Sequence, residues 1–380
     1  MEHAVRRPSL QSSAHAISVI VAVLLLLGLV MVYSTQAPLL ARKGGIDASW
    51  SPLLAQGYKI LVGLLLFGAG LMIRPSRVMK HHWPILLVAG FLLLLVCIPG
   101  VGARINGSRR WFMFGGLVFQ PVELARIALI VFLAARIEAL GPGIRSFSRG
   151  LLPLVAVLGL FAVLLLAQPD FGSALFFLGL GTLLLILGGA RLDHLALIML
   201  AGAVAVGMYA VGHLGHVMER MREFLNPSVS DHAYQSLLAL GSGGVVGTDL
   251  GAGMAKLGYL PMVSSDFILA AIGEELGLIG SSLVVLLFLL FAILGTRIAL
   301  AQRTPARFFL AAGVVISIST QAILNIAVVT GAVPTKGIAL PFVSSGGSSL
   351  AFSLFGVGML VALARPEEAE SGEPAGGHHG

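Results

Sequence analysis

The stretch YLPMVSSDFILAAIGEELGLIG, Tyr259 to Gly280, decides how the rest of the chain is interpreted. It places three carboxylates, Asp266, Glu274 and Glu275, at the start of a long apolar segment. An ionisable side chain inside or at the edge of a membrane span is costly unless it has a partner, and such residues are usually functional. We therefore take Asp266 as the first candidate for chemistry. The alternative is that this residue and the two serines before it only cap a helix.

Composition identifies the chain as an integral membrane protein. Its 380 residues are 57% hydrophobic and 11% charged, with a mean hydropathy of +0.97, whereas a soluble domain carries about 25% charged residues. The apolar runs are long enough for spanning helices rather than barrel strands. The net charge of +7 is then explained by topology and lipid headgroups, and we expect no nucleic-acid partner. The single cysteine, Cys97, excludes an internal disulfide framework.

We predict an all-α fold of about ten transmembrane helices. The apolar spans are roughly 13–35, 53–73, 84–100, 119–140, 151–168, 173–190, 194–214, 267–296, 308–331 and 347–364. More of the Lys and Arg residues lie in the gaps on the side of Arg6 and Arg7 than in the opposite gaps, which places both termini in the cytoplasm. The opposite gaps are still unusually basic for outer loops, which suggests that the outer face meets an anion.

The chain is predicted to form one membrane domain, 13–365, between a cytoplasmic segment, 1–12, and a polar tail, 366–380, that we expect to be disordered. The longest gap, 215–265, lies outside, between the seventh and eighth spans, and has too few apolar residues for a core of its own. Within it, the stretches 216–227 and 233–244 indicate short helices that can lie in the membrane interface. An ordinary connector is the alternative.

The position of Asp266 along its helix indicates its depth in the membrane. A helix from Asp266 to Arg297 is longer than the ~30 Å hydrocarbon core at ~1.5 Å per residue. Counting back from Arg297 places Glu274 and Glu275 near the outer edge of the core and Asp266 about two turns further out. A group at that depth can meet a phosphate or a sugar attached to a lipid.

A second candidate group is FQPVELAR, 119–126. Pro121 suits the first turn of a helix. Glu123 and Arg126 are spaced i, i+3, so the two side chains can form an ion pair. The pair is either structural, or it holds a cation or positions a polar headgroup.

A third group is ARINGSRRW, 103–111, on the outer side. Arg109 and Arg110 offer bidentate recognition of phosphate, and Trp111 is typical of an interfacial anchor. Plain contact with lipid headgroups is the alternative.

A fourth group is TGAVPTKGIALPFVSSGGSS, 330–349, which reads as an irregular outer segment carrying the point charge of Lys336. Its last residues, 346–349, open the final helix with free backbone N–H groups, which is either an anion site or an ordinary turn and cap. In QPDFG, 168–172, Asp170 either caps the next helix or joins the acidic cluster.

Taken together, NGSRRW, FQPVELAR, QPDFG, SDFILAAIGEELG and PTKGIALPFVSSGGSS resemble the SEDS family of shape, elongation, division and sporulation proteins, typified by FtsW, RodA and SpoVE. The forms DFILAAIGEELG and PTKGIALPFVS look more like the FtsW branch. The family's essential aspartate falls on Asp266, and the Glu and Lys of its fourth helix fall on Glu123 and Arg126. The sequence departs from the family at 262–265 and at Ser345.

The resemblance implies a peptidoglycan glycosyltransferase that polymerises lipid II on the outer face of the bacterial cytoplasmic membrane, for cell division or cell shape. It implies partnership with a class B penicillin-binding protein and with other division or elongation membrane proteins. Asp266 would act as general base on a sugar hydroxyl, and undecaprenyl pyrophosphate would leave. Mg²⁺ or Mn²⁺ would be held by Asp266 or Glu123. The predicted substrate-binding residues are Arg109, Arg110, Glu123, Arg126, Lys256, Glu274, Lys336 and Ser348.

Two other functions fit the same spans. One is a transporter that flips lipid II, which would need polar groups through the whole depth of the membrane. The spans 151–168, 173–190 and 194–214 hold almost no charge, which favours the enzyme. The other is a non-catalytic scaffold for division proteins, suggested by the altered residues around Asp266.

Overall fold

The computed structural model describes residues 10–105, 108–114, 117–212, 224–226, 228, 231–257, 260 and 262–365. Within them, six helical segments are long and apolar enough to cross a membrane, and three shorter helices are also apolar. The helices are α1 (Leu10–Ser49), α2 (Ser51–Met72), α3 (Pro75–Lys80), α4 (His82–Leu95), α5 (Pro121–Leu140), α6 (Leu152–Leu166), α7 (Phe171–Leu187), α8 (Leu192–Gly212), α10 (His232–Ser242), α11 (Ile268–Leu300), α12 (Pro305–Val329) and α13 (Gly347–Leu363). The chain is therefore a multi-pass membrane protein.

A helix occupies each of the ten predicted spans, but several boundaries differ from the predictions. Helix α1 continues well past residue 35 to Ser49, with a break at Gly45, where φ is 80°. Helix α4 ends at Leu95 rather than near 100, and residues after it turn back toward a sheet. Helix α5 begins at Pro121, as predicted.

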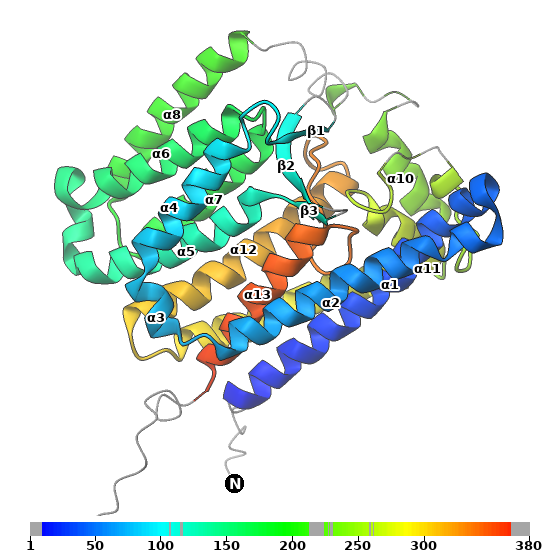
Figure 1. Ribbon diagram of the computed structural model, residues 1–380, viewed down its shortest axis with the longest axis horizontal. Coiled ribbons are helices and arrows are strands. Elements are labelled where there is room, and N and C mark those ends of the chain that lie inside the picture. Colours follow the sequence, from blue (N-terminus) through cyan, green and yellow to red (C-terminus); the bar gives the residue numbers. More distant parts are fainter. Residues whose placement is uncertain are drawn as a thin grey trace, which may run out of the picture.

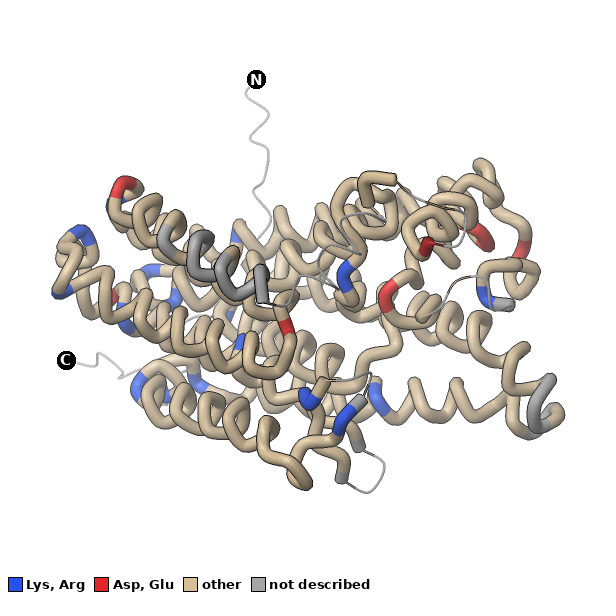
Figure 2. Tube along the Cα trace, turned by 90° about the horizontal axis from the view of Figure 1, so that it is seen from above, with Lys and Arg blue, Asp and Glu red and all other residues tan. Residues whose placement is uncertain are grey.

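The helices lie side by side in a slanted bundle (Figure 1), and α5 is enclosed within it over a buried run from Ala125 to Ala134. The start of α1 and the end of α13 lie at one end of the bundle, whereas the sheet, α10 and the loop from α12 to α13 lie toward the other (Figure 1). Lys and Arg gather at one end of the tube in Figure 2, and most Asp and Glu lie toward the other. This arrangement agrees with a bundle whose two ends face different compartments.

The prediction of a purely helical chain is wrong for residues 103–119. They form a three-stranded antiparallel sheet, β1 (Ala103–Ile105), β2 (Ser108–Phe114) and β3 (Leu117–Phe119), in the order β1-β2-β3. The sequence SRRWFMF is rich in aromatic residues that favour strands. Phe112 stacks on its cross-strand partner Phe119 at a centroid distance of 6.2 Å. Pairing satisfies backbone groups that an open loop next to the bundle would leave unpaired.

Helix α11 is not the single straight rod assumed in the depth count. At Gly277 the backbone has φ 66° and ψ −162°, so a short helix, 268–276, meets a longer one at an angle. An added Cβ at Gly277 would lie 2.5 Å from the carbonyl oxygen of Val245, so the loop backbone packs into the break. Only glycine suits both the positive φ and this close approach. The distance of Asp266 from the membrane core therefore cannot be counted along one helix axis.

One of the two short helices predicted in the outer segment is present among the described residues. It is α10, which covers most of the predicted stretch 233–244, and its buried residues Ala233, Ser236 and Ala239 share one face. The Ser236 hydroxyl donates to the carbonyl of Val329 at the end of α12, at 2.9 Å. Most of the predicted helix at 216–227, most of the N-terminal segment and the tail 366–380 lie outside the described residues.

Candidate active site

Asp266 lies in the turn immediately before α11. The N-cap position of α11 is Phe267, and no side chain caps the helix, so the capping alternative for Asp266 is wrong. Burial raises the pKa of the Asp266 carboxyl to about 6, with the Ser265 hydroxyl lowering it in part. A carboxyl that ionises near neutral pH can accept a proton effectively from a reacting hydroxyl.

The segment between α12 and α13 packs directly against Asp266. Asn325 of α12 donates through Nδ2 to the carbonyl of Asp266, at 2.8 Å, and to that of Ile338, at 2.7 Å. Gly337 lies so close that an added Cβ would be 2.9 Å from Oδ2 of Asp266. Sequence reasoning did not select Asn325, although a fully buried amide in an apolar helix is itself a sign of a functional or structural role.

Lys336 precedes Gly337 in the same segment, and its side chain extends to the start of α7. Its side chain crosses Gly172, where an added Cβ would lie 2.4 Å from the Cε atom of Lys336 and 3.4 Å from Oδ1 of Asp170. Burial lowers the pKa of Lys336, and the negative charge of Asp170 acts in the opposite direction. The motifs at 168–172 and 334–337, far apart in sequence, therefore meet, and Gly337 of the second motif contacts the carboxyl of Asp266.

Arg110 joins this group through the turn before α7. Its guanidinium lies 3.5 Å from the carboxylate of Asp170 and donates to the carbonyls of Gln168 and Pro169. Asp170 also accepts from the backbone N–H of Ser173, at 3.0 Å, so the prediction that it caps the next helix is confirmed. These bonds fix Arg110 and Asp170 to each other, and the side chain of Lys336 lies close to the same carboxylate.

Arg109 does not share this position. Side chains alternate along a strand, so Arg109 lies on the face of β2 opposite Arg110 and the buried Phe112. The two side chains therefore point to opposite faces of the sheet, and each arginine would meet a phosphate separately. A role for Arg109 alone in substrate binding stays a prediction.

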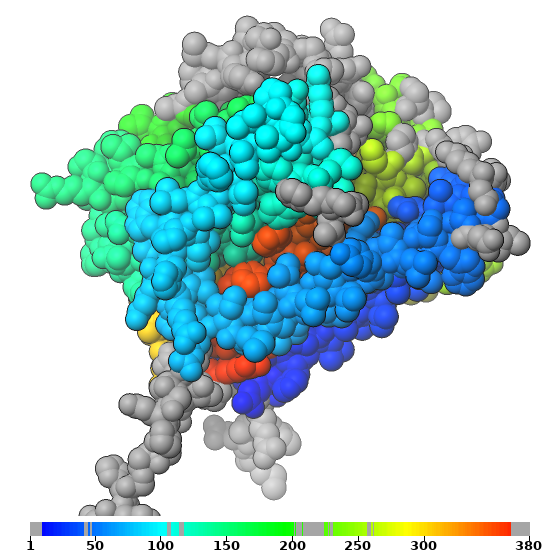
Figure 3. All heavy atoms as spheres, viewed as in Figure 1, coloured from blue at the N-terminus to red at the C-terminus, as the bar shows by residue number. Residues whose placement is uncertain are grey.

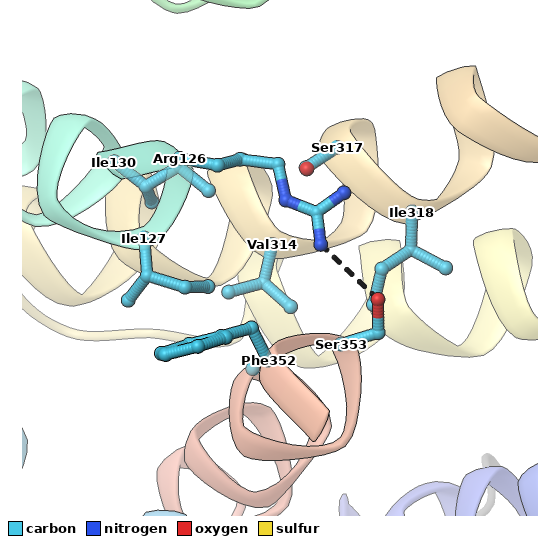
Figure 4. Close-up of a pocket in the computed structure, with 9 residues that line it drawn as sticks. Arg126, Ile127, Ile130, Val314, Ser317, Ile318, Phe352 and Ser353 are labelled. Carbon is cyan, nitrogen blue, oxygen red and sulfur yellow. Dashed lines mark hydrogen bonds between the residues drawn. The ribbon is translucent and has the colours of Figure 1, made fainter. Parts of the chain in front are cut away.

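Glu123 and Arg126 form the predicted ion pair, with 2.9 Å between the carboxylate and the guanidinium. Arg126 is only 4% exposed, and it also donates to Gln321 of α12 and to Ser353 of α13, the latter at 3.1 Å. Figure 4 shows the guanidinium reaching from α5 toward Ser353 and Ser317. Gln321 in turn donates to the carbonyl of Ala339. The pair thus supports the segment that packs on Asp266.

Lys256 and Glu275 form a second buried ion pair, at 2.7 Å, with side chains 3% and 1% exposed. The Ser34 hydroxyl of α1 and the N–H of Gly251 also donate to Glu275. Glu274 accepts from the N–H groups of Met254 and Ala255, at 2.6 and 3.1 Å. These bonds hold the outer loop against α11, and they pair the charges of Lys256 and Glu274 without a substrate. The predicted substrate contacts of Lys256 and Glu274 therefore stay predictions.

Ser348 bridges the last helix to the sheet. Its hydroxyl accepts from the N–H of Gln120, at 3.0 Å, and donates to the carbonyl of Val118, at 2.9 Å. Just before it, the N–H of Ser345 donates to the carbonyl of Ser264, at 2.9 Å, so the start of α13 is held against the residues preceding Asp266. The predicted substrate contact of Ser348 also stays a prediction.

The described residues contain no group of three or more His, Cys, Asp or Glu side chains that could hold a metal ion. Glu123 is already paired with Arg126, so a cation there would compete with the guanidinium. Mg²⁺ is nevertheless often held by one carboxylate together with substrate phosphates. Asp266 fits that arrangement, and Glu123 fits it poorly.

The fold and the site together define a multi-pass membrane protein with a largely buried carboxyl, that of Asp266, which can ionise near neutral pH and contacts the segment that carries Lys336. The chain belongs to the FtsW, RodA and SpoVE family of cell cycle proteins, whose sequence model matches residues 14–369.

Relatives and solved structures agree with this assignment. A probable peptidoglycan glycosyltransferase FtsW of Geobacter sp. (strain M18) is 39% identical over 341 residues, 88% of this chain and 92% of the relative. The stage V sporulation protein E of Bacillus subtilis (strain 168) is 36% identical, over 93% of this chain and 98% of the relative. A chain in a structure described as a peptidoglycan synthase complex that coordinates polymerization and crosslinking superposes with a TM-score of 0.75 at 26% identity, covering 92% of this chain and 96% of that one. The rod shape determining protein RodA of Thermus thermophilus gives 0.66 at 27%, covering 92% and 95%.

Proposed function

We propose that this chain is a peptidoglycan glycosyltransferase that polymerises lipid II into glycan strands on the outer face of the bacterial cytoplasmic membrane. The relatives named as FtsW cover most of the chain at about 39% identity. The observation that carries the proposal is the carboxyl of Asp266, which is largely buried, is not used as a helix cap, and has a pKa raised to about 6.

In the proposed reaction, Asp266 removes the proton from the 4-hydroxyl of the GlcNAc on an incoming lipid II. The freed oxygen attacks the anomeric carbon of the lipid-linked MurNAc at the end of the growing chain. The bond from that carbon to the pyrophosphate breaks, undecaprenyl pyrophosphate leaves, and the configuration inverts. A positioned general base typically contributes ~10²–10⁴-fold to such a step.

Lys336 and Arg110 would stabilise the departing pyrophosphate. Lys336 and Arg110 meet at Asp170, so both positive charges lie near the segment that contacts Asp266. Preorganised positive groups act most strongly where negative charge develops. A divalent cation, Mg²⁺ or Mn²⁺, bound by Asp266 and the substrate phosphates would add Lewis-acid stabilisation of the leaving group.

We further propose that a class B penicillin-binding protein is the partner and that the chain works in cell division or shape maintenance with other membrane proteins. The similar chain in a peptidoglycan synthase complex supports this partner. The FtsW relatives favour division, and the sporulation protein supports a related role.

The deciding experiment uses the purified full chain, with and without such a partner, and labelled lipid II. We expect glycan strands that a muramidase degrades. A protein that moves lipid II across vesicle membranes but makes no strands would be a transporter, and one that does neither would be a scaffold. The predicted spans 151–168, 173–190 and 194–214 hold almost no charge, which favours polymerisation over transport.

A further inference from the structure

Helix α2 carries a buried amide whose hydrogen-bonding groups are unused. The Gln56 side chain is 1% exposed, and in the described part of the chain neither its Nε2 nor its Oε1 atom has a hydrogen-bond partner. Leaving a buried amide unpaired is destabilising, because the amide loses its hydrogen bonds to water and gains none in the protein. Such a group in a native fold needs an explanation, and a ligand is one of the few available.

The packing of α2 on α13 shows which part of the molecule Gln56 faces. An added Cβ at Gly63 would meet Leu354, and one at Gly70 would meet Phe355 and the N–H of Met359. Residue numbers rise together along both helices, so the two run parallel in register. Gln56 is one heptad before Gly63 on the same buried face, which places it opposite residues just before α13.

Lys59 faces the same point from one turn further along α2. Its ammonium donates to the Ser345 hydroxyl at 3.0 Å, and its Cγ atom would lie 3.8 Å from a Cβ added to Gly347. Among the described residues, Lys59 has no carboxylate within ion-pair distance. An ammonium within a membrane span and without a counter-ion needs an anion or an exit to the interface.

The start of α13 supplies further donors at this point. The N-cap residue is Gly346, which has no side chain to accept from the first turn, and the 17-residue helix follows directly. The first N–H groups of a helix and its dipole favour an anion. In Figure 3 the orange-red atoms of α13 are visible in a hollow between α2 and the cyan strands, so this region opens to the surface.

From these contacts we infer that Gln56, Lys59 and the first turn of α13 form a binding site for the phosphate group of a lipid, separate from the cluster of Arg110, Asp170 and Lys336. A phosphate oxygen would accept from the ammonium of Lys59, from Nε2 of Gln56 and from the helix N–H groups. Two sources share this chemistry: the pyrophosphate of a lipid-linked sugar and the headgroup of an ordinary phospholipid. The first source rests on the proposed function, because joining two lipid-linked sugars requires places for two pyrophosphates.

The binding test compares Lys59→Met with Lys80→Met, which removes the same charge from an exposed position on α3. The purified full chain is placed in phosphatidylcholine nanodiscs, and lipid II is titrated in. We expect Lys59→Met to weaken lipid II binding about 10-fold or more, Lys59→Arg to restore it, and Lys80→Met to leave it unchanged. If lipid II affinity stays unchanged while native mass spectrometry shows that Lys59→Met loses bound phosphatidylglycerol, the phosphate comes from a phospholipid. No change in either ligand overturns the site.

A second variant separates a ligand contact from a packing role. Gln56→Leu replaces the unpaired amide with an apolar side chain of similar size, which is neutral or stabilising when no ligand is bound. We expect an unchanged or higher melting temperature without lipid II and a smaller rise when lipid II is added. A lower melting temperature without lipid II, together with an unchanged rise on its addition, would show that Gln56 only packs. Wild-type protein that binds lipid II without polymerising it would contradict the proposed function and leave this site standing.

Discussion

Gly337 lies directly against the carboxyl of Asp266, since a Cβ at residue 337 would be 2.9 Å from Oδ2. Its φ is not in the left-handed region, so alanine is compatible with the backbone and its methyl group would act by displacing the carboxyl. Small misplacements of a catalytic group cost up to about 10²-fold in rate. We expect Gly337→Ala to lower lipid II polymerisation by about that factor in a gel assay while the melting temperature changes little.

The matched control is Gly179→Ala in α7, where an added Cβ meets nothing within 4 Å. It makes the same chemical change far from Asp266 and should keep wild-type activity. Equal activity of the two variants would show that the contact between Gly337 and Asp266 has no role in the reaction.

Replacing Asp266 by asparagine keeps the shape of the side chain and removes the base. We expect Asp266→Asn to reduce polymerisation at least ~10²-fold in a folded protein with the elution profile of the wild type. Asp249→Asn is the control, because Asp249 is an exposed carboxylate on the same outer loop with a φ of 82° that asparagine tolerates. Strand formation by Asp266→Asn at the wild-type rate would exclude this residue as the base.

The raised pKa of Asp266, about 6 against an ordinary 3.8, predicts two pH profiles. Activity should rise between pH 5 and pH 7, with its midpoint near pH 6, because only the ionised form accepts a proton. Stability should change in the opposite direction. The folded state favours the protonated acid, because its pKa is higher than that of the unfolded chain. The contribution of Asp266 to the free energy of unfolding is therefore complete below pH 3.8 and is lost as pH rises through 6.

Thermal melting at several pH values checks the stability profile. Above pH 6, Asp266→Asn should be more stable than the wild type, and the two should converge at low pH. An activity profile that is flat from pH 5 to pH 8 would contradict the assigned pKa or the role of Asp266.

The sequence was sufficient to predict the helices because long apolar runs have few other solutions in a membrane. It was also sufficient to predict local contacts such as Glu123 with Arg126, since i, i+3 spacing fixes their proximity. It could not predict that Lys336 would cross Gly172, because that contact depends on how two distant loops pack. The sheet at 103–119 was missed because its strands are short and lie between long helical segments.

The kink at Gly277 shows a similar limit. A glycine in an apolar run is common in membrane helices, so Gly277 alone does not indicate a break in the helix. The close approach of the Val245 carbonyl to Gly277 shows that the loop packs into such a break. Lys59 gave a usable signal, a lysine within a span, but its neighbour Ser345 lies 286 residues away in sequence. Long-range pairing of this kind is what a single sequence does not specify.

The buried pair of Lys256 and Glu275 predicts a stability effect rather than a catalytic one. Lys256→Met leaves Glu275 as a buried carboxylate without its cation, which costs about 3–5 kcal/mol in unfolding free energy. The double variant Lys256→Met/Glu275→Leu should recover much of that loss, since both charges are gone. The exposed pair Arg191 and Asp193, with side chains 56% exposed, serves as control, and Arg191→Met should change stability little.

Unfolding in detergent mixtures checks these variants. A Lys256→Met protein with normal stability and impaired lipid II binding would instead support the earlier prediction that Lys256 contacts the substrate.

Lys336 offers the sharpest test of how the leaving group is stabilised. Lys336→Met removes the charge near Asp170 and keeps the length of the side chain that crosses Gly172, so we expect a loss of about 10²-fold in kcat/KM with the fold retained. Lys336→Arg should recover part of that loss, because arginine also pairs with phosphate.

The same residue predicts the alkaline limb of the pH profile. Burial lowers the pKa of Lys336 below the ordinary 10.5, so wild-type activity should decline at a lower alkaline pH than that value. In Lys336→Arg the decline should move to higher pH, because a guanidinium stays charged. If the alkaline limb is the same in both proteins, another group titrates there, and Lys336 acts through packing rather than through its charge.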